Sequence, residues 1–144
     1  MKIAIGSDHG GVELKETLKI YLTELGHTYD DCGTNSHDSV DYPDIAKEVC
    51  SKIVNKDCDF GILVCGTGIG MSIAANKIDG IRAAVCSDEF SARMTKSHNN
   101  SNVICFGQRV IGDELAKSVL TAYMEAEFMG GRHQVRVDKI TSLE

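Results

Sequence analysis

The sequence has no apolar stretch of the roughly 18 residues that a membrane-spanning helix needs. It also begins without a charged segment followed by an apolar one, because Lys2 leads directly into a short strand-like run, so no signal peptide is expected. Neither feature favours a membrane partner, and we predict a cytoplasmic protein. No repeat, low-complexity run or linker is present, which indicates a single domain over residues 1–144.

Positive charge is scarce. The chain has 15 Lys and Arg against 21 Asp and Glu, and a formal net charge of -6. This balance argues against nucleic acid as a main partner. Proline is scarcer still, since Pro43 is the only one. It stands where we expect a helix to begin, and the first turn of a helix does not need the N–H group that proline lacks.

The six cysteines include no Cys-x-x-Cys pair and no tight framework spacing, which argues against disulfides. Most of them are expected to be small buried hydrophobic residues. Asp8, His9, Cys65 and His98 are side chains of types that bind metals, but no pair has the spacing of a helical His-x-x-x-His site. We therefore expect no metal site and no cofactor.

Short apolar runs alternate with helical patterns along the chain. Strands are predicted over 2–6, 27–31, 60–64, 81–86 and 102–106, and helices over 12–25, 43–55, 71–77, 88–96, 113–129 and from 132 onward. Such alternation is typical of a parallel sheet covered on both faces. The fold class is therefore a Rossmann-like three-layer α/β/α sandwich with a five-stranded parallel sheet. The C-terminal helix has a narrow apolar stripe and is expected to pack on a partner subunit.

The glycine-rich segment Cys65-Gly66-Thr67-Gly68-Ile69-Gly70 joins a buried strand to a small-residue helix. Several unpaired backbone N–H groups converge at such a helix start and can bind an anion. The same groups favour the thiolate form of Cys65 and stabilise negative charge that develops on a substrate. Cys65 is therefore a candidate base or nucleophile, with a buried structural cysteine as the alternative.

Two nucleotide-binding motifs resemble this segment but do not match it. A dinucleotide fingerprint needs its third glycine one position later, where the chain has Met71, although Asp88 lies about 20 residues on, as that fold requires. A phosphate-loop NTPase is excluded because no Gly-Lys-Ser/Thr sequence follows the glycines. The glycine segment is thus interpreted as an anion-binding turn of another kind.

Ligands of parallel sheets bind beyond the carboxyl ends of the strands, so Asp8-His9, the Cys65 segment, Asp88 and the turn at Gly107 should share one edge. His98 follows on a helix end, where a simple C-terminal cap is the alternative. Arg132 and Arg136 lie four residues apart on one helical face. Two guanidinium groups there suit a phosphate between them, with solvated arginines as the alternative. These residues together indicate a phosphorylated small molecule and proton transfer next to a carbonyl.

Several motifs in combination resemble those of the type B ribose-5-phosphate isomerases, within the ribose/galactose isomerase family. They are Gly6-Ser7-Asp8-His9-Gly10-Gly11, Asp41-Tyr42-Pro43, Cys65 to Gly70, Ser72 to Lys77, His98-Asn99, Phe106 to Val110 and Gly130-Gly131-Arg132-His133. The resemblance runs almost end to end. It implies interconversion of ribose 5-phosphate and ribulose 5-phosphate through an enediolate, without metal or organic cofactor, in a homodimer or a dimer-built tetramer.

The resemblance also implies roles for individual residues. Cys65 is the base, His98 opens the furanose ring, and Thr67 belongs to the catalytic set. The substrate-binding set is Asp8, His9, Asn99, Arg109, Arg132, Arg136 and the turn residues Gly66, Thr67, Gly68, Ile69 and Gly70, whose amides hold the enediolate oxygen. Some members use a glutamate of the following helix instead of the cysteine. Residues 71–76 contain no carboxylate, so this chain fits the cysteine subgroup.

Two alternative functions remain open at this point. The chain could isomerise a six-carbon sugar phosphate such as allose 6-phosphate or galactose 6-phosphate, because the glycine turn and the arginines would serve those substrates equally well. A non-catalytic sugar-phosphate sensor is disfavoured, because it needs neither a thiol nor an imidazole. We further hypothesise that each site of a two-fold dimer takes Cys65 from one chain and Arg132 from the other.

Overall fold

Five parallel strands form a single sheet with β3 at its centre. The computed structural model describes all residues 1–144 and gives the strand order β2-β1-β3-β5-β4. The strands are β1 (Lys2–Ser7), β2 (Thr28–Asp31), β3 (Phe60–Cys65), β4 (Ala83–Val85) and β5 (Val103–Gly107). The predicted five-stranded parallel sheet is therefore confirmed.

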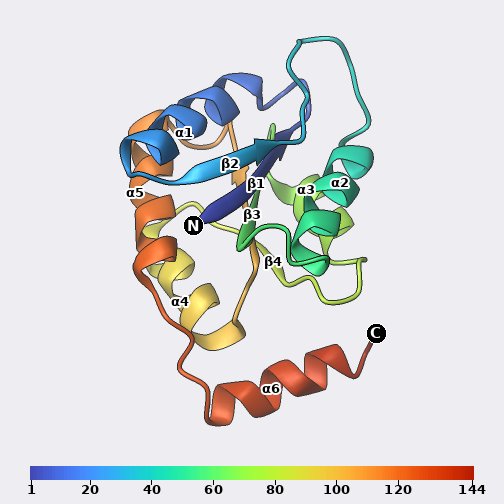
Figure 1. Cartoon of the computed structure of the whole chain (residues 1–144), viewed down its shortest axis with the longest axis vertical. Helices are drawn as coiled ribbons and strands as arrows, with labels where there is room; N and C mark the ends of the chain where they lie inside the picture. The colour runs from blue at the N-terminus through green and yellow to red at the C-terminus, as the bar shows by residue number, and fades with distance from the viewer.

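Helices cover both faces of this sheet, which confirms the three-layer α/β/α arrangement (Figure 1). They are α1 (Val12–Glu24), α2 (Tyr42–Val54), α3 (Ile69–Ala75), α4 (Glu89–Asn99), α5 (Asp113–Glu125) and α6 (Arg132–Thr141). One face carries α1, α4 and α5, which bury residues such as Leu18 and Val119. The other face carries α2 and α3, which bury residues such as Val49 and Met71.

The central strand β3 is buried along its whole length. Ile62 and Val64 belong to the core beneath α1, α4 and α5, whereas Leu63 and Cys65 belong to the core beneath α2 and α3. Successive side chains of a strand point to opposite faces, so a strand covered on both faces is apolar throughout. The last side chain of β3, Cys65, therefore faces the α2–α3 layer at the carboxyl edge of the sheet.

A fully buried lysine attaches the loop after β2 to α1. The Nζ atom of Lys15 donates hydrogen bonds to both carboxylate oxygens of Asp31, at 2.7 and 2.9 Å, and to Oδ1 of Asn35 at 2.8 Å. A buried ammonium group needs such partners because desolvation is costly. These bonds fix the start of loop 32–41, which then reaches the end of β1, where Val40 N–H donates to His9 Nδ1 at 3.3 Å.

Helix α4 is longer than predicted and brings His98 into its last turn. The predicted helix ended at residue 96, but the observed one continues to Asn99 and ends at Asn100, which has a φ of 47°. Arg82 Nε donates to the terminal carbonyl oxygens of Asn99 and Asn100, at 3.1 and 2.9 Å. This side chain from a distant segment satisfies helix-end acceptors, which explains the extra turn.

Helix α5 is shorter than predicted. The sequence pattern extended it to residue 129, but it ends at Glu125 because Ala126 adopts an extended backbone. The N–H of Met129 instead donates to the carbonyl oxygen of Ser97 on α4, at 3.0 Å. Residues 126–131 therefore cross the end of α4, and the predicted boundary was wrong because a tertiary hydrogen bond replaces the helical ones.

Helix α6 lies outside the three layers, across the end of the molecule below α4 (Figure 1). Val137 is buried, but Ile140 and Leu143 of the same stripe are 43% and 84% exposed. Most of this stripe is therefore not covered by the sheet of its own chain. Packing of α6 on a partner subunit stays a prediction.

Candidate active site

Three strand ends meet at the carboxyl edge of the sheet. The N–H of Asp8, after β1, donates to the Val64 carbonyl at 3.1 Å, and the N–H of Gln108, after β5, donates to the Cys65 carbonyl at 2.9 Å. Arg109 N–H donates to the Gly66 carbonyl at 3.0 Å. The structure therefore brings Asp8, Cys65 and Arg109 to one edge through direct backbone contacts.

Gly68 shapes the turn that follows Cys65. Its φ is 78°, and a Cβ atom there would lie 2.9 Å from the carbonyl carbon of Phe106. Only glycine suits both constraints. This conformation directs the N–H of Gly68 to the Sγ of Cys65, at 3.0 Å, while the N–H of Ile69 donates to the Thr67 hydroxyl at 3.2 Å.

The remaining amides of the turn are free to bind a ligand. No hydrogen bond within the chain uses the N–H groups of Gly66, Thr67, Gly70 or Met71. A group of unpaired donors at a helix start attracts negative charge. The turn can thus stabilise both a thiolate on Cys65 and an oxyanion of a bound substrate.

The other five cysteines lack this environment. Burial raises the pKa of Cys32 to about 11, of Cys50 to about 12 and of Cys86 to about 11. Burial also raises the pKa values of Cys58 and Cys105. These thiols stay protonated at neutral pH and behave as small hydrophobic side chains, as predicted for most of the cysteines.

The side chains of the β1 turn are held in defined orientations. Asp8 is buried and its Oδ1 accepts the N–H of Gly10 at 2.8 Å. His9 is half-buried, and its Nδ1 accepts the N–H of Val40. A neutral His9 therefore carries its proton on Nε2, which can donate to a ligand. The Arg109 side chain lies against Gly66, because a Cβ on that glycine would be 3.3 Å from Nη1.

The other predicted site residues lie at the opposite edge of the sheet. Helix α4 begins at the carboxyl end of β4 and runs back to the amino end of β5, so His98 and Asn99 lie at its far end. Its 11 residues span about 16 Å at 1.5 Å per residue. Arg132 and Arg136 are exposed on α6, which contacts the end of α4. A single chain therefore does not bring His98 and the two arginines to Cys65.

His133 is a residue of this second group that the sequence reasoning left without a role. Its ring stacks on that of His98, with centroids 4.2 Å apart and planes 6° apart. Burial lowers the pKa of His133, and the nearby His98, Arg132 and Arg136 lower it further. Its spacing could have indicated that it is buried, because His133 precedes the buried Val137 by one helical turn and so lies on the same face of α6.

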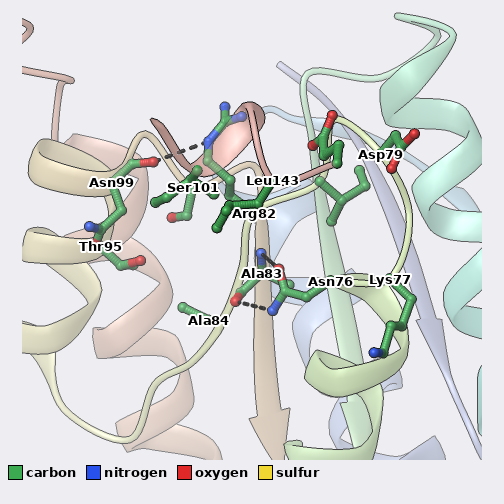
Figure 2. A pocket seen from close by; sticks show the side chains of 13 residues that line it. Asn76, Lys77, Asp79, Arg82, Ala83, Ala84, Thr95, Asn99, Ser101 and Leu143 are labelled. Atoms are coloured by element: carbon green, nitrogen blue, oxygen red, sulfur yellow. Dashed lines mark hydrogen bonds between the residues drawn. The ribbon is translucent and has the colours of Figure 1, made fainter. Parts of the chain in front are cut away.

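The largest cavity, of about 680 Å³, lies at the β4 edge of the sheet and not beside Cys65. Figure 2 shows its lining, in which Arg82 bonds to Asn99 and Asn76 bonds to the backbone of Ala83. No residue of the 65–70 turn lines any of the three cavities in the chain. The carboxyl edge alone thus forms an open surface and not a closed pocket.

No group of three or more His, Cys, Asp or Glu side chains is placed to hold a metal ion. No helix has both the length and the apolar character needed to cross a membrane. The features that the structure does contain define a Rossmann-like α/β protein with a thiol and free backbone amides at the carboxyl edge of its central strand.

A family model described as Ribose/Galactose Isomerase matches residues 3–140. The chain belongs to this family, so the resemblance inferred from the motifs is confirmed. It is 49% identical over 143 residues to ribose-5-phosphate isomerase B of Escherichia coli, covering 99% of this chain and 96% of that relative. It is 50% identical over 145 residues to a putative sugar phosphate isomerase of Bacillus subtilis, covering 100% of this chain and 97% of the relative.

A solved structure gives the same result for the fold. Ribose-5-phosphate isomerase B of Clostridium thermocellum superposes with a TM-score of 0.98 at 48% identity, covering 99% of this chain and 97% of that one. Similarity of this extent includes the segments at both edges of the sheet.

Proposed function

We propose that the chain interconverts D-ribose 5-phosphate and D-ribulose 5-phosphate by proton transfer through an enediolate. The observation that carries this proposal is the hydrogen bond from Gly68 N–H to Cys65 Sγ, beside amides that have no other partner. Near-full-length relatives named as ribose-5-phosphate isomerase B support the choice of substrate. Residues 1–144 act as one domain, in the cytoplasm, on a small sugar phosphate and without a metal or organic cofactor.

Cys65 is the base of the proposed reaction. Its thiolate takes the proton from C2 of the open-chain aldose, the electron pair moves into the C1–C2 bond, and negative charge develops on the C1 oxygen. The free amides of the turn from Gly66 to Gly70 stabilise that charge. After a proton passes from the C2 oxygen to the C1 oxygen, the thiol returns its proton to C1. Thr67 accepts from Ile69 N–H, so its hydroxyl hydrogen can donate to a substrate oxygen.

His98 opens the furanose ring before this transfer. It donates a proton to the ring oxygen, and the proton of the anomeric hydroxyl is released. Asp8, His9, Asn99 and Arg109 contribute hydrogen bonds to the sugar phosphate. The paired arginines of α6, Arg132 and Arg136, bind the phosphate, which holds the reacting carbons at a fixed distance from their anchor.

A two-fold dimer would bring the Cys65 edge of one chain next to the His98 and arginine group of the other. Each site then takes Cys65 from one chain and His98, Arg132 and Arg136 from the other, because a two-fold axis pairs unlike patches reciprocally. Exposed apolar side chains near β4 support such an interface: Ile69, Ile73 and Phe90 are 54%, 61% and 73% exposed. Edge strand β4 also has one unpaired side. The assembly is a homodimer or a tetramer built from two such dimers.

An isomerase assay on a panel of aldose phosphates tests this function. Ribose 5-phosphate should give the highest kcat/KM, and the six-carbon phosphates allose 6-phosphate and galactose 6-phosphate should react far more slowly. Cys65→Ala should reduce turnover at least about 100-fold while the circular dichroism spectrum stays unchanged, because a general base contributes that much. Preference for a six-carbon substrate would contradict the ribose assignment, and retained turnover in Cys65→Ala would contradict the role of the thiol.

A further inference from the structure

His98 and His133 form a stacked pair, and the proposed reaction assigns no role to the imidazole of His133. His133 is 5% exposed, and its ring lies 4.2 Å from that of His98 with an angle of 6° between the planes. The Nε2 atom of His133 is buried without a hydrogen-bond partner. His98, by contrast, is only partly buried. The pair therefore has one enclosed ring and one ring with access to a ligand.

The backbone on both sides holds this stack in place. The N–H of Met129 donates to the Ser97 carbonyl at 3.0 Å, which fixes the approach to α6 next to the last turn of α4. Gly131, the N-cap residue just before α6, has a φ of 56°. Figure 1 shows α6 running across the end of α4. The two rings are thus positioned by two helices that are tied to each other.

We propose that His133 is a positioning residue that fixes the ring plane of His98 by stacking. The inference rests on the proposed role of His98 in ring opening. The N–H and the lone pair of an imidazole both lie in the ring plane, so fixing that plane also fixes the direction in which His98 donates and accepts protons. A misdirected acid loses a large part of its effect.

The charges around the stack agree with a positioning role for His133 and a proton-transfer role for His98. Burial lowers the pKa of His133, and the nearby groups His98 on α4 and Arg132 and Arg136 on its own helix lower it further. A second positive charge within the stack would repel the first. The buried His133 is therefore the less favourable ring for a positive charge, while His98 is the ring that a substrate can reach.

Four variants of the full-length protein test the inference: His133→Ala, His133→Phe, Val137→Ala and His98→Asn. Each is assayed on ribose 5-phosphate, which must open its ring, and on a four-carbon aldose 4-phosphate, which cannot form a furanose because its terminal hydroxyl carries the phosphate. His133→Phe keeps an aromatic ring against His98. Val137→Ala is the matched control for a general loss of packing by α6, since it removes a buried side chain of that helix while both imidazole rings remain.

We expect His133→Ala to lower kcat on ribose 5-phosphate about 10-fold or more relative to the four-carbon substrate, as a partial loss of the roughly 100-fold effect of an acid. His133→Phe should stay within about 3-fold of wild type on this ratio, and Val137→Ala should leave the ratio unchanged. In NMR spectra, the ring proton of His98 should lose its ring-current shift in His133→Ala and keep one in His133→Phe.

The outcomes separate this inference from the function on which it rests. A selective loss in His98→Asn together with an equal loss on both substrates in His133→Ala overturns the positioning role alone. The same conclusion follows if His133→Phe is as impaired as His133→Ala. An equal loss on both substrates in His98→Asn overturns ring opening by His98, and the positioning role fails with it.

Discussion

Mixing two inactive variants, Cys65→Ala and His98→Asn, tests whether an active site is shared between subunits. Within one chain, α4 carries His98 away from the carboxyl edge along 11 residues, or about 16 Å. A substrate whose reacting carbons lie at Cys65 cannot also contact the His98 of that chain at its ring oxygen. If the two-fold dimer is correct, the missing imidazole comes from the partner chain.

The expected gain follows from counting sites. Random pairing of two variants gives heterodimers in half of the molecules. In each heterodimer, one site combines Cys65→Ala with His98→Asn, and the other site has both native side chains. One site in four is then intact, so the mixture should recover about a quarter of the wild-type activity on ribose 5-phosphate. If each chain supplies its own histidine, no site is intact and no activity is gained.

The assay co-refolds equal amounts of the two variants and measures kcat, with native mass spectrometry to count heterodimers. Cys65→Ala mixed with Arg132→Ala should show the same gain, because Arg132 lies on the His98 side. His98→Asn mixed with Arg132→Ala is the control and should show none, because in each heterodimer one lesion falls in each site. Absence of a gain in the first mixture, with heterodimers present, would refute the shared site.

Three further predictions concern the fold around the site. Gly68→Ala should destabilise the protein by about 2 kcal/mol or more in urea unfolding, because of its left-handed φ and the contact of the new Cβ with Phe106. Gly112→Ala is the comparison: its φ is -83° and a new Cβ meets nothing within 4 Å, so it loses only the preference of a helix N-cap for glycine and should cost no more than about 1 kcal/mol. Equal effects would contradict this account of the turn. Lys15→Met should cost about 3 kcal/mol, because it leaves the carboxylate of Asp31 without its main partner; a neutral result would mean that the pair adds nothing to stability. Burial raises the pKa of Asp31, but hydrogen bonds from lysines outweigh this effect and leave the pKa lowered. The contribution of Asp31 to the free energy of unfolding is therefore complete above the unfolded pKa of about 4 and is lost as pH falls through the lower folded value. Asp31→Asn should flatten the decline of the unfolding free energy below pH 4, and an unchanged slope would contradict the assignment.

The sequence alone determined the sheet, its helical layers and the family of this protein. The apolar run from Phe60 to Val64 predicts a strand buried on both faces, because such a strand needs apolar residues at every position. The glycine segment after it predicts a turn with free amides, because Gly68 can adopt a conformation that other residues resist. These features are local, and a local sequence pattern indicates directly which residues are buried and which residues form a turn. The motifs that indicated the family are likewise short and contiguous.

Only the tertiary structure decided how the predicted site residues are grouped. His98 and Cys65 look like members of one site in the sequence, yet a helix that returns along the sheet places them at opposite edges. The early end of α5 depends on a hydrogen bond from Met129 to Ser97, and the stack of His133 on His98 depends on how α6 crosses α4. Each of these contacts joins segments far apart in the chain, so its free energy depends on the packing of whole helices and leaves no periodic pattern in the sequence.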